Sequence, residues 1–158
     1  NKATLKPIQM LKPICERYKF KGEQTLVDGM AGGPNYGTGQ WIAFQKNDME
    51  AVVDLKELTS VEKAWVRTYV EIGEEVVDLR KFTVAVSEDG KNFKEVASES
   101  YPAVSENDKN GIYTHELTFA PVQARYVKLI AQPENSLPAW HWGKGRPGFI
   151  FVDEIGVE

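Results

Sequence analysis

The residues best suited to chemistry in this sequence are aromatic and basic. Trp140, His141 and Trp142 are consecutive in a stretch rich in proline and glycine, and Arg146 follows them. Exposed aromatic faces stack on the C–H surface of pyranose rings, while His, Arg and Asn side chains form hydrogen bonds with sugar hydroxyls. The predicted ligand-binding residues are Asn35, Tyr36, Trp41, Trp140, His141, Trp142 and Arg146. The alternative is that Trp41 and one of the loop tryptophans cover the core, because tryptophan is usually largely buried.

Acidic residues give no catalytic pair. Cleavage of a glycosidic bond needs two acids that face each other across a cleft. Asp153 and Glu154 are adjacent, as are Glu74 and Glu75, and neighbours on a strand point to opposite faces. A lone strand histidine such as His115 is more often structural than catalytic. We therefore expect no catalytic residue and no enzymatic activity in this chain alone.

The composition excludes several classes of protein. The chain has 158 residues and a net charge of −4, which suits one domain and leaves no basic surface for nucleic acid. No apolar run reaches the roughly 18 residues of a membrane span. A single cysteine excludes an intrachain disulfide. Because the chain begins at Asn1 without a signal peptide, we expect one domain, residues 1–158, excised from a larger protein.

Alternating apolar residues predict strands in five places. The inward-facing rows are Ala51, Val53 and Leu55; Ala64, Val66, Thr68 and Val70; Phe82, Val84 and Val86; and Val127, Leu129 and Ala131, with residues 149–157 closing the series. Such patterning is typical of antiparallel sheets packed face to face. Asp89-Gly90 marks a hairpin between two strands, and residues 29–39 and 133–148 form long loops. The fold class is therefore an all-β sandwich.

An ordered set of motifs resembles a known family across most of the chain. The set comprises Leu26-Val27-Asp28-Gly29, Val52-Val53-Asp54-Leu55, residues 84–93, Arg125-Tyr126-Val127-Lys128-Leu129 and residues 151–157. It is similar to the discoidin, or coagulation-factor type C, domain, a group that includes family 32 carbohydrate-binding modules of the galactose-binding-like superfamily. The resemblance implies a jelly-roll sandwich of about eight antiparallel strands. Residues 137–141 and 151–155 further resemble the C-terminal module of Bacteroidetes-type family 20 β-hexosaminidases.

The same resemblance implies a structural calcium ion. Its carboxylate ligands would be Asp28 and Glu154, with a hydroxyl from Thr38 and a carbonyl from Gly33. Calcium takes hard oxygen ligands and suits a flexible glycine-rich loop. The alternative is that Asp28 only forms hydrogen bonds within its own turn.

The resemblance implies a non-catalytic carbohydrate-binding module of a secreted or periplasmic glycoside hydrolase, with galactose- or N-acetylhexosamine-type glycans as ligands. The expected partners are glycans and the parent catalytic domain, without nucleic acid or membrane insertion. The alternative is a structural interdomain module that packs on the parent catalytic domain and binds no sugar. In that case Trp65 and Tyr69, on the outward face of their strand, would contact the parent domain.

Overall fold

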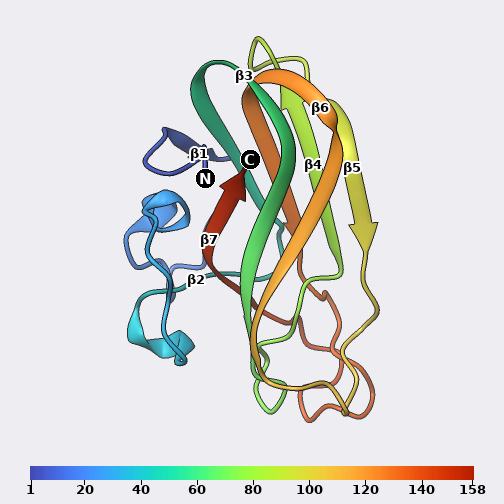
Figure 1. Cartoon of the computed structure of the whole chain (residues 1–158). Coiled ribbons are helices and arrows are strands. Elements are labelled where there is room, and N and C mark those ends of the chain that lie inside the picture. The colour runs from blue at the N-terminus through green and yellow to red at the C-terminus, as the bar shows by residue number, and fades with distance from the viewer.

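Seven β-strands and two short 3-10 helices make up the computed structural model, which describes residues 1–158 (Figure 1). The strands are β1 (Ile8–Met10), β2 (Ile42–Phe44), β3 (Met49–Val70), β4 (Lys81–Ser87), β5 (Lys94–Ser100), β6 (Gly111–Gln132) and β7 (Ile150–Val157). The helices are η1 (Gly22–Val27) and η2 (Tyr36–Thr38). Neither helix is long or apolar enough to cross a membrane. The predicted all-β class is confirmed.

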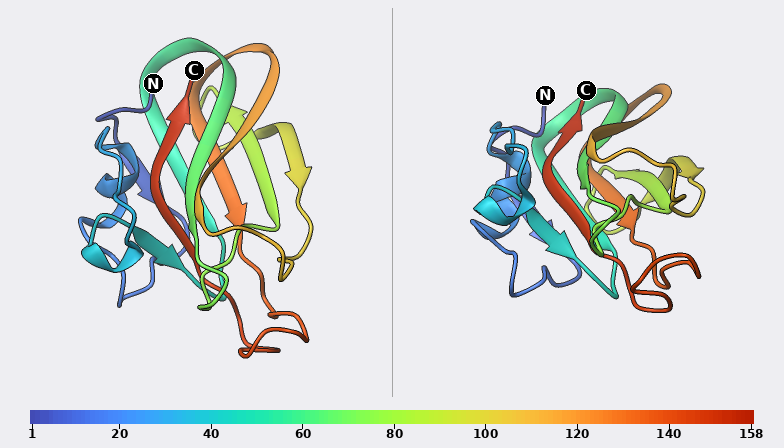
Figure 2. Two further views of the ribbon diagram at one scale, coloured as in Figure 1. Left: turned by 60° about the horizontal axis from the view of Figure 1, so that its bottom comes forward. Right: turned by 90° about the horizontal axis from the view of Figure 1, so that it is seen from below.

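Two long strands build both layers of the sandwich. β3 and β6 each have 22 residues and pair antiparallel, with residues 49–54 opposite 126–131 and residues 63–70 opposite 111–118. The register shifts between these two halves, and Lys56 adopts a positive φ of 75° at the bend. In the first half, β1 pairs with β3 and β4 pairs with β6, and β5 pairs with the other edge of β4. In the second half, β7 pairs with β3, and β2 pairs with the other edge of β7. The bend therefore lets one strand pair contribute to both layers (Figures 1 and 2).

The core lies between these layers and follows the predicted alternation. Every residue of the predicted inward-facing rows is buried, with Ala51, Val66, Phe82 and Leu129 fully inaccessible to solvent. The intervening residues of β3, Trp65, Arg67 and Tyr69, are partly exposed. Alternation places one face of each strand in the core, so the sequence pattern and the observed packing agree.

The predicted hairpin joins β4 to β5. Gly90 takes a φ of 78°, which suits glycine because it has no Cβ. The Asp89 carboxylate accepts hydrogen bonds from the backbone N–H groups of Lys91 and Asn92 at 2.8 Å and from the Ser87 hydroxyl at 2.9 Å. These bonds hold the pKa of Asp89 well below its usual range. The hairpin is therefore a defined turn that stays anionic at its centre.

Candidate functional site

Three connecting segments come close to one another toward one end of the sandwich; two of them form the lower end in Figure 1, and the stretch with η2 lies on the left side. They are the stretch 29–41 that contains η2, the turn 71–76 after β3, and the loop 137–149 before β7. We call this the apical end. Hydrogen bonds between backbone atoms fix the turn against the loop, as from Phe149 N to Glu75 O at 2.7 Å. The apical end thus brings together residues that are distant in sequence.

His141 ties the loop to the turn. Its side chain is buried, with 3% exposed. Its Nδ1 accepts a hydrogen bond from Gly143 N at 2.9 Å, so the ring proton lies on Nε2 and is directed at the carbonyl oxygens of Ile72 and Glu74, each 2.8 Å away. Both ring nitrogens are occupied within the protein. His141 therefore positions the loop, and its ring does not face a ligand.

The neighbouring tryptophans are exposed. Trp140 is 40% exposed and Trp142 is 62% exposed. Trp142 Nε1 donates a hydrogen bond to Gly73 O at 2.8 Å, and the Arg146 guanidinium lies 5.8 Å from the centre of its ring. The hydrogen bond fixes the orientation of the indole while most of its surface stays in solvent. This arrangement suits stacking on the apolar face of a sugar.

A small pocket of about 170 Å³ shares the turn 71–76 with Trp142, since Glu74 and Glu75 line the pocket and Gly73 accepts the indole hydrogen bond. Its lining residues are Arg17, Tyr18, Tyr36, Glu74, Glu75, Val76, Phe149 and Phe151. Tyr36 packs against Phe151 with ring centres 4.8 Å apart. Burial, with a smaller contribution from the negative charge of Glu74, raises the pKa of the Tyr36 hydroxyl. The pocket combines an aromatic wall with charged groups of both signs.

Glu75 connects the pocket to the exposed loop. Its Oε2 lies 3.3 Å from Arg146 Nε as an ion pair, but is buried and accepts no hydrogen bond. The ion pair compensates the carboxylate charge and ties the turn to the loop. The sequence predicts Glu74 and Glu75 as neighbours on a strand, whereas in the structure they lie in the turn that follows β3.

Sequence patterns missed several pocket residues. Arg17, Tyr18 and Phe149 carry no motif, because Arg17 and Tyr18 lie in an irregular N-terminal segment and Phe149 reads as part of the last strand. Tyr18 could have been found only through its contact with Phe151, whose ring centre is 4.9 Å away. Such contacts depend on how the chain folds, and local sequence does not encode them.

Besides His141, two more of the predicted ligand-binding residues have other roles in the structure. Trp41 is 1% exposed, and its Nε1 donates a hydrogen bond to Gly33 O at 3.0 Å. Its ring therefore belongs to the core, as the alternative interpretation held. Asn35 is exposed, but its Oδ1 accepts a hydrogen bond from Gly37 N at 2.8 Å and so begins η2.

The outward residues of β3 are largely covered by the chain itself. Tyr69 donates a hydrogen bond to Pro34 O at 2.7 Å and packs against Trp41. Trp65 lies over Gly156 and donates a hydrogen bond to Glu158 Oε2 at 2.8 Å. Since η2 and its flanks cover Tyr69, this residue is not free to contact a separate domain.

Two buried carboxylates, Asp153 and Glu154, lie on β7 near the partly buried Asp28, which follows η1. A bulge in β7 pairs Glu154 with Arg67 and Val152 with Thr68, which leaves Asp153 without a partner residue on β3. The bulge interrupts the regular alternation from which we predict opposite directions for Asp153 and Glu154. Both side chains are buried and both experience the negative charge of Asp28. We call Asp28, Asp153 and Glu154 the acidic cluster.

Burial dominates the electrostatics of the acidic cluster. Loss of solvent, followed by the charges of Asp28 and Asp153, raises the pKa of Glu154 to about 8. Burial also raises the pKa of Asp153 to about 6, although hydrogen bonds from Gly32 N and Arg67 Nη1 to its Oδ2 oppose this shift. One oxygen of each, Asp153 Oδ1 and Glu154 Oε1, has no hydrogen-bond partner. Unpartnered buried carboxylate oxygens fit a hard cation.

The other predicted metal ligands are engaged elsewhere. The Thr38 hydroxyl donates a hydrogen bond to Asn35 O at 2.9 Å within η2, and the Gly33 carbonyl accepts from Trp41. Asp28 Oδ1 accepts from Met30 N at 2.8 Å, as in a turn. No group of three or more His, Cys, Asp or Glu side chains converges closely enough to hold a metal ion alone. Asp153 Oδ1 and Glu154 Oε1 are thus free of hydrogen bonds, whereas the oxygens of Gly33 and Thr38 are engaged, and these residues do not form a complete metal site in this arrangement.

The fold and its motifs define the class of protein. The F5/8 type C domain family matches residues 15–144, which is most of the chain. The chain therefore belongs to the F5/8 type C, or discoidin, family. No curated protein sequence gives a significant match.

Three solved structures that share this fold are carbohydrate-binding modules. A chitosan-binding module from Paenibacillus sp. IK-5 is 16% identical with a TM-score of 0.60, covering 100% of this chain and 98% of that one. A fucose-binding module from Streptococcus pneumoniae is 20% identical with a TM-score of 0.60, covering 99% and 93%. A family 32 module from Clostridium perfringens, in complex with GalNAc-β-1,3-galactose, is 18% identical with a TM-score of 0.57, covering 96% and 93%. These identities establish the shared fold.

Proposed function

We propose that this domain is a non-catalytic carbohydrate-binding module whose apical end binds a terminal sugar. The observation that carries the proposal is the pair of exposed side chains Trp140 and Trp142, on a loop that is bonded to the turn whose Glu74 and Glu75 line a small aromatic pocket. The relatives described above bind chitosan, fucose or a GalNAc-galactose disaccharide. Their variety supports sugar binding as a class and leaves the particular sugar to experiment.

The proposed contacts follow from the chemistry of each group. The two indoles stack on the apolar face of a pyranose, and Arg17 donates hydrogen bonds to hydroxyls at the pocket. Glu75 is ion-paired with Arg146 and holds that guanidinium against the turn. Because the surface is shallow and the pocket small, we expect dissociation constants of about micromolar to millimolar.

Titration of galactose, N-acetylgalactosamine and N-acetylglucosamine, followed by tryptophan fluorescence, tests the proposal. We expect a saturable change with at least one sugar and a loss of affinity of about tenfold or more in Trp142→Ala, as for stacked aromatic residues in hot spots. Trp65→Phe is the matched control, since Trp65 lies away from the apical end, and it should bind normally. The absence of a response to every sugar, with or without calcium, would count against the proposal.

We further propose a structural calcium ion held by Asp28 and Glu154. The unpartnered oxygens of Glu154 and Asp153 support it, and carbonyl groups of residues 29–33 would complete the ligand set once that segment moves. A bound divalent ion offsets the repulsion among the carboxylates and fixes the glycine-rich segment. Thermal unfolding with calcium or with EGTA tests this: calcium should raise the Tm of the native protein but leave that of Asp28→Asn unchanged. Equal Tm values for the native protein in both conditions would exclude the ion.

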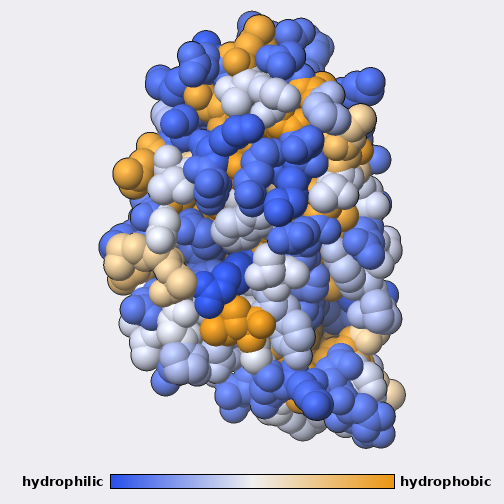
Figure 3. Space-filling model, in the orientation of Figure 1, coloured by the Kyte–Doolittle hydropathy of each residue, from blue (hydrophilic) through white to orange (hydrophobic).

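The biological setting we propose is that of an accessory module in a secreted or periplasmic glycoside hydrolase, a β-N-acetylhexosaminidase. The resemblance of residues 137–141 and 151–155 supports this setting. The alternative, a module that packs on a catalytic domain and binds no sugar, predicts a broad apolar docking face. Figure 3 shows only small, separated apolar patches on the face in view. A structure of the parent enzyme in which Trp140 and Trp142 are covered would favour the alternative.

A further inference from the structure

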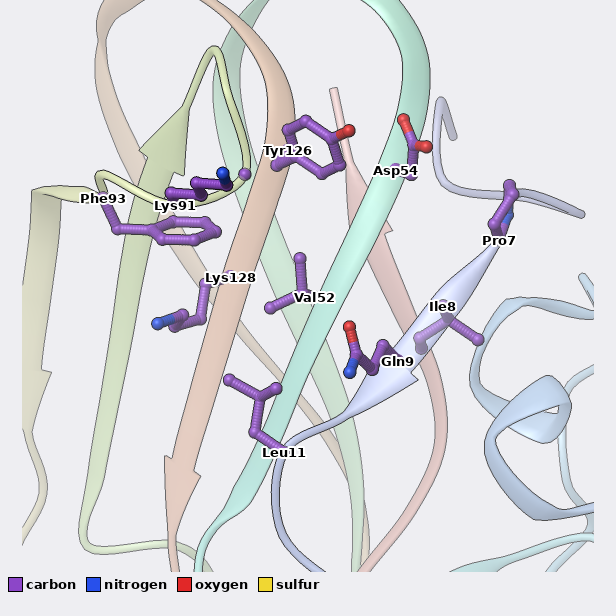
Figure 4. A pocket seen from close by; sticks show the side chains of 11 residues that line it. Pro7, Ile8, Gln9, Leu11, Val52, Asp54, Lys91, Phe93, Tyr126 and Lys128 are labelled. Carbon is purple, nitrogen blue, oxygen red and sulfur yellow. The ribbon is translucent and has the colours of Figure 1, made fainter.

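A second concave surface lies on the sheet, away from the apical end. This sheet groove has a volume of about 450 Å³, within the usual range for ligand sites. Its lining residues are Pro7, Ile8, Gln9, Leu11, Val52, Asp54, Gly90, Lys91, Phe93, Tyr126 and Lys128 (Figure 4). β3 and β6 form its floor, while β1 and the hairpin after β4 form its two sides (Figure 4).

The strand register explains why these side chains share one face. Gln9 pairs with Val52, and Val52 pairs with Lys128, so the three form one row across β1, β3 and β6. Asp54 and Tyr126 form the next row. Their neighbours along the strands, such as Val53 and Val127, are buried, which directs these rows outward. With strands about 4.8 Å apart, β1 and β6 lie roughly 10 Å apart, a width suited to a single saccharide chain.

The groove is positively charged within an acidic protein. Neither Lys91 nor Lys128 forms an ion pair, and the Lys128 ammonium lies over the Phe93 ring, 4.2 Å from its centre. The one acid in the lining, Asp54, accepts two hydrogen bonds from Arg125 at 2.9 and 3.0 Å. Hydrogen bonding to Arg125 lowers the pKa of Asp54, so its charge is already compensated. Two ammonium groups are left without a counter-ion, although the net charge is −4.

The sides of the groove are pre-arranged. Gly90 packs so closely on Tyr126 that a Cβ there would lie 3.1 Å from the ring. Hydrogen bonds to Asp89 fix the same turn, and the turn carries Lys91 and Phe93. The Tyr126 hydroxyl and the Gln9 amide make no hydrogen bond within the chain, so both are free to bind hydroxyl groups. A fixed groove with free polar groups needs little ordering to bind a ligand.

From these features we propose that the sheet groove is a second binding site, for an acidic saccharide chain built of uronate residues. The two ammonium groups receive carboxylates of the chain, and Phe93 and Tyr126 contact the apolar faces of its rings. A uronate chain carries one negative charge per sugar, whereas a densely sulfated chain carries more. The lower charge density suits a groove that offers only two isolated lysines. This site is separate from the apical end and does not depend on sugar binding there.

An amide NMR titration with tri-galacturonate tests the proposal, with its methyl ester as an uncharged ligand of the same shape. We expect shifts at residues 9, 52, 91–93 and 126–128, binding that weakens with added salt, and at least fivefold weaker binding of the methyl ester. Lys91→Gln/Lys128→Gln should weaken binding of tri-galacturonate by a similar factor. The control Lys81→Gln/Lys109→Gln, which alters exposed lysines outside the groove, should not.

Other outcomes would overturn the proposal. These are equal binding of acid and methyl ester, equal loss in both double variants, or shifts confined to residues 71–76 and 137–149. A heparin oligosaccharide that binds the groove while tri-galacturonate does not would contradict the uronate assignment. Trp142→Ala should leave tri-galacturonate binding unchanged, which separates failure at this site from failure at the apical end.

Discussion

The two glycine-rich segments of this domain use similar residues in opposite ways. In residues 29–41, Trp41 is buried and Asn35 caps a short helix. In residues 137–149, two tryptophans are exposed and a histidine between them is buried. The same residue types thus support the core in one segment and a candidate ligand surface in the other.

The difference comes from what each segment packs against. Trp41 lies beside Tyr69, with ring centres 5.4 Å apart, so the tryptophan of the first segment packs on the sandwich and its ring is lost to solvent. The second segment is attached through His141 and through the indole N–H of Trp142. Polar anchors of this kind hold a loop in place while its aromatic faces stay accessible, which is the arrangement that sugar binding requires.

Replacement of Trp41 should give the largest effect on stability. Trp41→Ala removes a buried ring, which costs roughly 3–5 kcal/mol of unfolding free energy. Urea unfolding measures it, and Trp142→Ala serves as the matched control. If the two variants lost equal stability, the distinction between the two segments would be wrong.

The acidic cluster should make stability depend on pH. The pKa of Glu154 is raised from 4.5 to about 8 in the folded protein, so the folded state binds more protons than the unfolded state between these values. Stability should therefore fall as pH rises from about 5 to about 8 in EGTA, with a Tm decrease of several degrees, about 5 °C or more. Asp153, with its pKa raised to about 6, contributes in the same direction at lower pH.

Glu154→Gln is the control for this prediction. It removes the main titrating group, so its Tm should change less between pH 6 and pH 8 than that of the native protein. A native Tm that rises over this interval in EGTA would contradict the assignment of a raised pKa to Glu154.

His141→Ala should have an intermediate effect. It leaves the carbonyl groups of Ile72 and Glu74 without their donor, which costs about 1–3 kcal/mol. Hydrogen exchange should show faster exchange in residues 71–76, with little change in the β4–β5 hairpin. Unchanged exchange in the turn would mean that His141 does not anchor it.

Trp142→Ala and Trp140→Ala should have the smallest effect on stability. Trp142 contributes one hydrogen bond at the surface, worth about 1 kcal/mol, and Trp140 contributes none. Urea unfolding of each variant should remain within about 1 kcal/mol of the native value. A larger loss for either variant would indicate a structural role in place of the proposed binding role.

The sequence predicted the fold well because alternation is a local signal. The rows from Ala51 to Leu55 and from Val127 to Ala131 are buried as expected. It did not predict that β3 and β6 are each 22 residues long and shared by both layers, because the bend near Lys56 depends on long-range pairing.

The candidate site was predicted in part. Trp140 and Trp142 lie on the surface, but the burial of Trp41 and His141 depends on contacts with distant segments. The bulge at Asp153 is another long-range feature, since it arises from the register between β3 and β7. Residue type and spacing therefore identify candidate ligand-binding side chains, whereas tertiary packing determines which of them a ligand can reach.

The central claim is that the apical end binds sugar, and amide NMR with galactose, N-acetylgalactosamine and N-acetylglucosamine tests it most directly. The account predicts saturable shifts at residues 71–76 and 137–149 for at least one sugar, and their loss in Trp142→Ala. Shifts confined to other parts of the domain, or none at sugar concentrations of tens of millimolar, a range above the affinity of about micromolar to millimolar expected here, would contradict it.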